Sequence, residues 1–175
     1  MNNNKPKLSF LVCGSGKAGT TWLHACCEEH PEICVPIRNK ELHFFSKYYD
    51  KGFNWYNAYF NHYKNEKAIG ELCPTYFYTD NYSNVAQRIY KSYPEVKIVL
   101  ILRHPVEKAY SDYRMLLRAG KVSTEIESVI VPGWDHVETA RYYYHLCSYL
   151  KFFPKNNIHI LLYDDLVKDP KTFLM

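Results

Sequence analysis

Residues 13–23, with the sequence CGSGKAGTTWL, carry the residue types best suited to chemistry on a phosphate. They follow a short apolar segment, Leu8–Cys13, and combine three glycines, one lysine and two threonines. Glycines let a backbone approach an anion closely and point successive N–H groups at it. The N-terminus of a following helix adds a partial positive charge. The segment therefore predicts a phosphate cradle between a strand and a helix.

This loop fits three phosphate-binding patterns to different degrees. The dinucleotide pattern G-x-G-x-x-G is met by Gly14, Gly16 and Gly19. No carboxylate follows the expected second strand to hold a ribose, although Arg38 there suits a 2′-phosphate. The triphosphate pattern G-x-x-x-x-G-K-[ST] is met in its glycine spacing, but the lysine, Lys17, lies inside the loop. The third pattern, Lys-x-Gly-Thr-Thr after a strand, is matched throughout. A plain turn with a solvated lysine is disfavoured because glycines are entropically costly.

A second candidate phosphate site follows the apolar segment Lys97–Leu102. Arg103 leaves this segment shortly before Pro105, which suits the first position of a helix, and Ser111 lies further along that helix. The carboxyl ends of parallel strands meet at one edge of a sheet, so Arg103 and Ser111 are expected near Lys17. Two phosphate sites predict a nucleotide phosphorylated at two positions. The alternatives are a structural ion pair for Arg103 and an ordinary helix serine.

The elements that must position these residues alternate along the chain. Strands are expected at Leu8–Cys13, Glu32–Val35, Ala68–Leu72, Lys97–Leu102 and Asn157–Tyr163. Helices are expected at Thr20–His30, Asn54–Tyr63, Tyr82–Tyr93, Pro105–Arg118 and Asp135–Phe153. The alternation predicts an α/β fold in three layers, with a mostly parallel central sheet and helices on both faces. The last helix is expected to bury one stripe formed by Val137, Ala140, Tyr144, Cys147 and Leu150.

Length and composition narrow the function classes. A chain of 175 residues suits one domain, and a net charge of +4 favours a small anionic ligand over nucleic acid. Six cysteines without a C-x-x-C pair argue against a zinc site and for a reducing compartment. The apolar run near the N-terminus is too short for a signal peptide or a membrane span. We expect a cytoplasmic protein with no metal, nucleic acid or membrane partner, and a homo-oligomer stays open.

Three motifs, in this order and spacing, resemble the sulfotransferase family that uses 3′-phosphoadenosine 5′-phosphosulfate (PAPS). They are GKAGTTWL at 16–23, KELHFF at 40–45, and LRHP through AYSDY at 102–113. Within the family the chain is most similar to heparan-sulfate-type and related bacterial enzymes. There too a Glu-x-His-Phe-Phe segment precedes a Gly-x-x-Trp-Tyr segment, here residues 52–56. The resemblance runs from about Leu8 to the end of the chain and implies a P-loop-NTPase-like fold.

The resemblance also implies a role for each matching residue. Lys17 contacts the 5′-phosphosulfate and stabilises the leaving group, Glu41 is the catalytic base, and His43 lies near the acceptor. Arg103 and Ser111 bind the 3′-phosphate. The implied nucleotide-binding set is Gly16, Lys17, Ala18, Gly19, Thr20, Thr21, Trp22, Arg103 and Ser111. The implied reaction moves a sulfuryl group in line from PAPS to a hydroxyl group or amine of a small-molecule or carbohydrate acceptor. It leaves 3′-phosphoadenosine 5′-phosphate (PAP) and needs no metal.

Two other interpretations stay open. Family domains continue past the Asp-Asp-Leu region, here 164–166, with a helix and a basic, glycine-containing loop. Residues 1–175 are therefore interpreted as one sulfotransferase domain that lacks this segment, and a non-catalytic PAP- or PAPS-binding module is the first alternative. The second is a P-loop kinase or an NADP oxidoreductase, although no Walker-type aspartate follows an apolar strand. Structural roles are the alternatives for the two residues of the proposed acceptor site. Glu41 is then a solvated carboxylate or an ion-pair partner of Lys40 or Arg38, and His43 is a packed residue.

Overall fold

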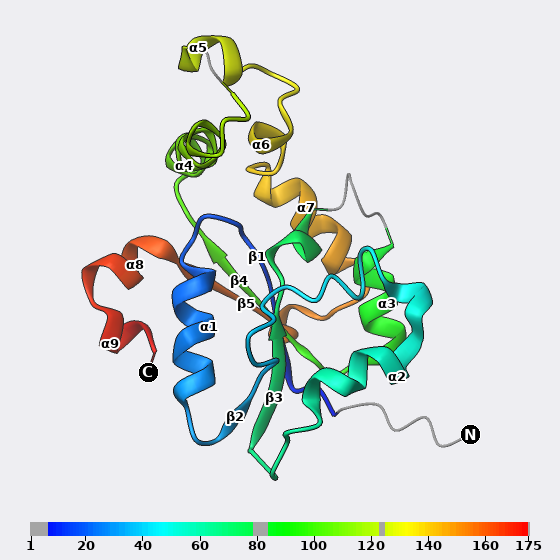
Figure 1. Cartoon of the computed structure of the whole chain (residues 1–175). Coiled ribbons are helices and arrows are strands. Elements are labelled where there is room, and N and C mark those ends of the chain that lie inside the picture. Colours follow the sequence, from blue (N-terminus) through cyan, green and yellow to red (C-terminus); the bar gives the residue numbers. More distant parts are fainter. Residues whose placement is uncertain (1–6, 79–83, 123–124, 175) are drawn as a thin grey trace.

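The computed structural model describes residues 7–78, 84–122 and 125–174, and these contain one five-stranded sheet. The strands lie in the order β2–β3–β1–β4–β5, and every neighbouring pair is parallel (Figure 1). Their bounds are Phe10–Gly14 for β1, Ile33–Cys34 for β2, Ala68–Leu72 for β3, Lys97–Leu102 for β4 and Ile158–Leu162 for β5. The predicted parallel sheet is thus confirmed.

Side chains of the central strands alternate between two hydrophobic layers. Leu11 and Ile98 belong to the larger buried cluster, whereas Val12 and Leu72 belong to a smaller one. The two-residue period of a strand produces this division. In Figure 1, α1 lies on one side of the sheet, and α2, α3 and α7 lie on the other. The three predicted layers are therefore confirmed. The covering helices are α1 (Thr20–Glu29), α2 (Gly52–Asn57), α3 (Val85–Ser92) and α7 (Tyr142–Leu150).

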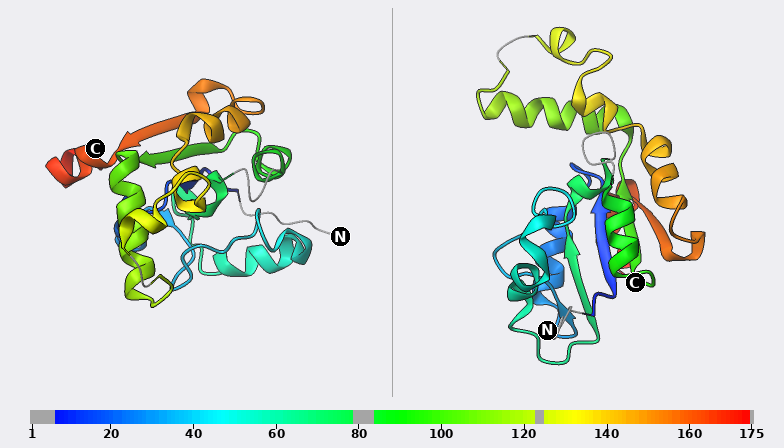
Figure 2. Two further views of the ribbon diagram at one scale, coloured as in Figure 1. Left: turned by 90° about the horizontal axis from the view of Figure 1, so that it is seen from above. Right: turned by 90° about the vertical axis from the view of Figure 1, so that its right-hand side faces the viewer.

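A further group of helices stands beyond the carboxyl ends of the strands (Figure 2). The longest of them, α4 (Pro105–Arg118), starts with a proline, whose missing N–H has no partner to lose at a helix start. Gly120, with a φ of 65°, follows its end. The others in this group are α5 (Ile126–Val129) and α6 (Asp135–Glu138), whereas α8 (Tyr163–Lys168) and α9 (Pro170–Phe173) follow β5 and lie beside α1 (Figure 1). Short 3₁₀ helices cover Tyr49–Lys51, Ala58–Phe60, Pro74–Phe77 and Lys155–Asn157.

The predicted single helix Asp135–Phe153 is wrong, because the structure divides it into α6 and α7. Two tertiary contacts hold the pieces separately. Lys108 Nζ on α4 donates to the buried Thr139 hydroxyl at 2.6 Å, just after α6. At the start of α7, the Tyr142 hydroxyl donates to the carbonyl of Arg103 at 2.8 Å. These contacts override the continuous helical pattern of the sequence.

The predicted buried stripe of this region is wrong for the same reason. Tyr144 and Leu150 are exposed, whereas His145 and Tyr149 face the core. Other elements differ mainly in their bounds. The expected helix Asn54–Tyr63 is α2 followed by a 3₁₀ turn. Tyr82 and Ser83, at the start of another expected helix, lie outside the described residues.

Candidate functional site

The phosphate loop joins β1 to α1 at the carboxyl edge of the sheet. Ser15 fixes its start, because the hydroxyl and the N–H of Ser15 both donate to the carbonyl of Ile101, at 3.0 and 2.8 Å. Gly19 precedes α1 with a φ of 81°, and a Cβ there would lie 2.6 Å from Leu166, so glycine is required. No described side chain caps the start of α1. An uncapped helix N-terminus of this kind attracts anions.

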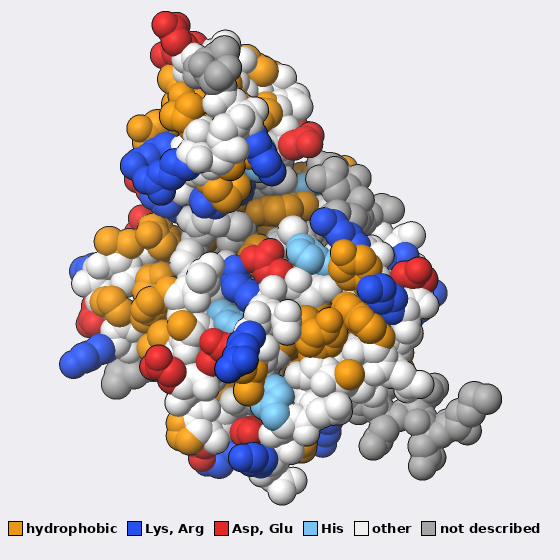
Figure 3. All heavy atoms as spheres, in the orientation of Figure 1, with side chains coloured by type: hydrophobic (Ala, Val, Ile, Leu, Met, Phe, Trp, Pro, Cys, Tyr) orange, Lys and Arg blue, Asp and Glu red, His pale blue; other side chains and the backbone are white. Residues whose placement is uncertain are grey.

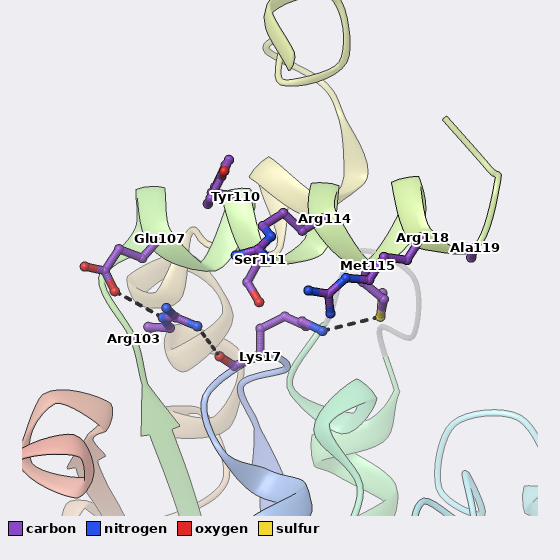
Figure 4. Close-up of a pocket in the computed structure, with 9 residues that line it drawn as sticks. All are labelled: Lys17, Arg103, Glu107, Tyr110, Ser111, Arg114, Met115, Arg118 and Ala119. Carbon is purple, nitrogen blue, oxygen red and sulfur yellow. Dashed lines mark hydrogen bonds and ion pairs between the residues drawn. The ribbon is translucent and has the colours of Figure 1, made fainter. Parts of the chain in front are cut away.

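Lys17, Arg103 and Ser111 line one cavity of about 740 Å³ between the phosphate loop and α4 (Figure 4). The guanidinium of Arg103 donates from Nη1 to the carbonyl of Lys17 at 3.2 Å and pairs through Nε with Glu107 Oε2 at 3.2 Å. It also lies 4.6 Å from the centre of the Tyr163 ring. The structure thus brings together the residues of both predicted phosphate sites.

Two arginines of the same cavity, Arg114 and Arg118, were not predicted from the sequence. They follow Ser111 on α4 at a spacing that keeps all three on one side of a helix, and this spacing is the signal that the sequence contained. Lys and Arg side chains gather over this helix in Figure 3. Because Glu107 is the one carboxylate among the described lining residues, the cavity suits a ligand with several negative charges.

Glu41 lies in the loop between β2 and β3 and is held against the start of α1 by its neighbour. Lys40 Nζ contacts Glu41 Oε1 at 2.5 Å and also donates to the Thr21 hydroxyl at 3.1 Å. The lysine therefore connects the predicted base to the first turn of α1. Sequence reasoning considered Lys40 only as an alternative ion-pair partner for Glu41, and the bond to Thr21 was missed.

His43 stands between the predicted base and a threonine that the sequence did not single out. Its Nε2 lies 3.9 Å from Glu41 Oε2, and its Nδ1 is 2.9 Å from the Thr75 hydroxyl. Burial lowers the pKa of His43, and nearby Lys47 lowers it further, whereas Glu41 opposes the shift. The ring is therefore biased toward its neutral form, with Thr75 fixing its orientation. The only sequence signal for Thr75 was its position just after the third strand.

The remaining predicted loop residues serve different local purposes. The N–H of Gly16 donates to the Tyr78 hydroxyl at 2.7 Å, a contact that the sequence did not reveal. Ala18 and Thr20 are buried, and Trp22 packs edge-on against Phe173 of α9 with ring centres 6.3 Å apart. Tyr78 thus holds the phosphate loop at Gly16, and Phe173 packs against the start of α1 that follows the loop. Its predicted contacts with a nucleotide stay predictions.

The arrangement places a cation-lined cavity beside an uncapped helix start, with a carboxylate at the neighbouring loop. Such a site is suited to bind a multiply charged anion and to take a proton from a group that approaches it. Among the described residues, no group of His, Cys, Asp and Glu side chains is arranged to hold a metal ion. Within the same residues, no helix has the length and apolar character needed to cross a bilayer.

Curated proteins with similar sequences include several sulfotransferases. The chain is 37% identical over 113 residues to membrane-associated sulfotransferase kil1 of Dictyostelium discoideum, an alignment covering 63% of this chain and 23% of that protein. It is 30% identical over 174 residues to heparan sulfate glucosamine 3-O-sulfotransferase 5 of Mus musculus, covering 91% of this chain and 49% of that protein. The chain therefore spans about half or less of the length of these relatives.

Two solved sulfotransferase structures have a fold similar to that of this chain. A sulfotransferase from Alicyclobacillus acidocaldarius superposes with a TM-score of 0.83 at 27% identity, covering 96% of this chain and 78% of that one. The sulfotransferase domain from the curacin biosynthetic pathway has a TM-score of 0.61 at 16% identity, which supports the fold alone. The family model described as the sulfotransferase domain matches residues 8–174. By this match, which covers nearly the whole sequence, the chain belongs to the sulfotransferase family.

Proposed function

We propose that this chain transfers a sulfuryl group from PAPS to an acceptor and releases PAP. The proposal rests on one observation: Lys17 from the phosphate loop lines the same cavity as Arg103 and Ser111 from the second predicted phosphate site (Figure 4). A nucleotide with phosphates at its 3′ and 5′ positions needs two such groups of donors at once. Membership of the family supports PAPS as the donor.

The reaction assigns a distinct task to each residue. As the bond between sulfur and the bridging phosphate oxygen breaks, Lys17 stabilises the charge that develops on the phosphate. A new bond forms between sulfur and the acceptor oxygen or nitrogen, and the acceptor proton passes to Glu41. Lys40 keeps that carboxylate beside the first turn of α1, and His43 orients the acceptor. By analogy with phosphoryl transfer, positioning and charge stabilisation provide most of the rate.

A carbohydrate hydroxyl is the acceptor class that we favour. Support comes from the relatives whose names specify 3-O-sulfation of heparan sulfate glucosamine. The arginines on α4 also suit an acceptor that already carries negative charge. A phenol, a small hydroxylated metabolite and an amine are the other classes for an acceptor panel. The expected cytoplasmic location and the open question of a homo-oligomer stay predictions.

Nucleotide binding gives the first test. At about 100 times the dissociation constant, PAP without any metal should raise Tm by roughly 5–10 °C, since a ligand at that excess stabilises the folded state by about 2.7 kcal/mol. Lys17→Ala and Arg103→Ala should each abolish this shift, because each removes a cation from one phosphate site. Lys151→Ala, which changes an exposed lysine outside the cavity, is the matched control and should keep the shift. Differential scanning fluorimetry measures all four proteins.

The same titration separates the alternatives. Stabilisation by ATP with Mg²⁺ but not by PAP contradicts the sulfotransferase proposal and supports a kinase. Tight PAP binding without any transfer of labelled sulfate from PAPS across the acceptor panel supports a non-catalytic binding module.

Glu41→Gln gives the second test, which concerns the base. The amide keeps the size of the side chain but cannot take a proton, so sulfate transfer should fall by about 10²–10⁴-fold while PAP still raises Tm. Transfer of radiolabelled sulfate and fluorimetry on the same preparation measure both properties. If PAP binding disappears together with transfer, Glu41 is a structural residue and the proposed base is wrong.

A further inference from the structure

A buried carboxylate outside the proposed reaction, Glu71 on β3, lies behind residues 40–46, which we name the 40–46 loop. Glu71 is only 1% exposed. Its Oε1 accepts hydrogen bonds from the Leu42 N–H at 3.1 Å and from the Tyr76 hydroxyl at 2.8 Å, and its Oε2 accepts from the Tyr56 hydroxyl at 2.7 Å. All three donors are neutral. Burying a carboxylate among neutral donors is costly, so a compensating role is expected.

The backbone of this loop is left-handed at both residues of the proposed acceptor site. Glu41 has a φ of 67° and His43 a φ of 54°, which side chains other than glycine rarely adopt. Leu42 lies between them, and its N–H is the one bound to Glu71. The N–H of Glu41 donates to the carbonyl of Leu72 at 3.2 Å. Two consecutive amides of the loop are therefore bound by two consecutive residues of β3.

The two tyrosines extend this support along the loop. The Tyr76 hydroxyl, which donates to Glu71, also accepts from the N–H of Phe45 at 3.3 Å. The ring of Tyr56 stacks on Phe44 with centres 4.4 Å apart and an interplanar angle of 18°. The Glu71 carboxylate thus holds the loop directly at one amide and, through the tyrosines, at two further residues.

We propose that Glu71 is the positioning residue of the 40–46 loop. It keeps the strained backbone that aims Glu41 and His43 at the acceptor, and it touches neither nucleotide nor acceptor itself. The proposal rests on the proposed function, because the aim of these two side chains matters only if they act on an acceptor. A purely structural Glu71 would affect folding and nucleotide binding together, whereas a positioning residue affects turnover at unchanged nucleotide binding.

The test compares Glu71→Ala with Glu71→Gln. The alanine removes every hydrogen bond, whereas the glutamine keeps an oxygen that accepts from Leu42. With PAPS and a heparan sulfate oligosaccharide, kcat should fall roughly 10²-fold in the alanine variant, the loss expected for a displacement of about 1 Å. The KM for PAPS and the Tm shift with PAP should not change. Glutamine should restore most of kcat. By NMR, the Leu42 amide should exchange with solvent faster in the alanine variant and stay protected in the glutamine variant.

Tyr76→Phe and Tyr149→Phe form a matched pair that does not alter the carboxylate, and they decide the question if Glu71→Ala does not fold. Both lose one buried hydroxyl from the same cluster. The Tyr149 hydroxyl donates to the carbonyl of Tyr76 at 2.7 Å and also interacts with Cys13 on β1, and neither of these partners belongs to the 40–46 loop. Tyr76→Phe should lower kcat and speed exchange of the Phe45 amide, whereas Tyr149→Phe should change neither.

Three results overturn the proposal. One is full kcat with protected Leu42 and Phe45 amides in Glu71→Ala and Tyr76→Phe. Another is a glutamine variant as inactive as the alanine variant, which makes the charge of Glu71 decisive. The third is loss of PAP binding together with kcat. If the wild-type protein transfers no sulfate, the proposed function fails, while amide exchange still decides whether Glu71 positions the loop.

Discussion

At the scale of single residues, Glu71 links the stability of the fold to pH. Burial raises its pKa to about 7 from an ordinary value of 4.5, against the opposing hydrogen bonds from Tyr56, Tyr76 and Leu42, while nearby Glu41 adds to the rise. A raised folded-state pKa means that the folded protein binds the proton more tightly than the unfolded chain. The stability from this proton is complete below about pH 4.5 and lost as the pH rises to about 7.

We therefore expect Glu71→Gln to flatten the pH dependence of stability. At about 1.36 kcal/mol for each unit of pKa, the wild-type protein should lose about 3 kcal/mol of unfolding free energy between pH 4.5 and pH 7 through this group. The neutral glutamine cannot make this contribution. Urea denaturation of both proteins at several pH values measures the difference. Parallel curves for the two proteins would show that Glu71 does not titrate in this range.

Single residues also show how much of the candidate site could be predicted from the sequence. Lys17, Arg103 and Ser111 were predictable as neighbours, because Lys17 and Arg103 each follow a parallel strand, such loops meet at one edge, and Ser111 lies on the helix after Arg103. Lys40 and Thr75 were not, because their contacts depend on the side-chain directions of Lys40 and His43, which lie in a loop with left-handed residues. Sequence spacing does not fix such directions outside helices and strands.

At the scale of elements, the junction between α4 and α6 depends on Lys108, which also forms a buried ion pair with Asp112 inside α4. Lys108 is 1% exposed, and its Nζ contacts Asp112 Oδ2 and the Thr139 hydroxyl at 2.6 Å each. Burial by itself would raise the pKa of Asp112, but the hydrogen bond from His136 and the charge of Lys108 hold it below its ordinary value. The ion pair lies within α4. The bond from Lys108 to Thr139 and the contact of Asp112 with His136 Nδ1 at 3.4 Å join this helix to the segment at α6.

Lys108→Met should lower the free energy of unfolding by about 3–5 kcal/mol, because it leaves a buried aspartate without its ammonium. Adding Asp112→Leu should recover part of this loss by removing the buried carboxylate that has lost its ammonium partner. Guanidinium denaturation of the single and double variants measures both effects. If the unfolding free energy of Lys108→Met lies within about 1 kcal/mol of the wild-type value, the ion pair contributes no more than an exposed salt bridge does.

The elements differed in how well the sequence predicted them. The strand Lys97–Leu102 and the helix Pro105–Arg118 were predicted with their bounds, because a continuous apolar run, a proline start and a glycine end mark them locally. The helix expected over Asp135–Phe153 was divided by contacts from α4 and Arg103 that lie far away in the sequence. Local periodicity contains no information about such contacts.

At the scale of the whole molecule, the alternation of strands and helices was enough to predict a layered parallel fold with its site at the carboxyl edge. The order of the strands was not predicted, since it depends on which strands pair across long crossovers. That order has a direct effect on the site. With β1 between β3 and β4, the phosphate loop after β1 is flanked by the segments that carry Thr75 and Arg103.

The hydrogen bond from Arg103 to the carbonyl of Lys17 ties the two predicted phosphate sites to each other directly. The guanidinium of Arg103 cannot leave the backbone of Lys17 without breaking that bond. The distance between two anionic groups on a ligand must therefore match the spacing that this bond sets between the phosphate loop and Arg103. A nucleotide whose phosphates are separated by a different distance can contact Lys17 or Arg103 well, but not both. The spacing of the phosphates, rather than the identity of the base, would then determine which nucleotides bind.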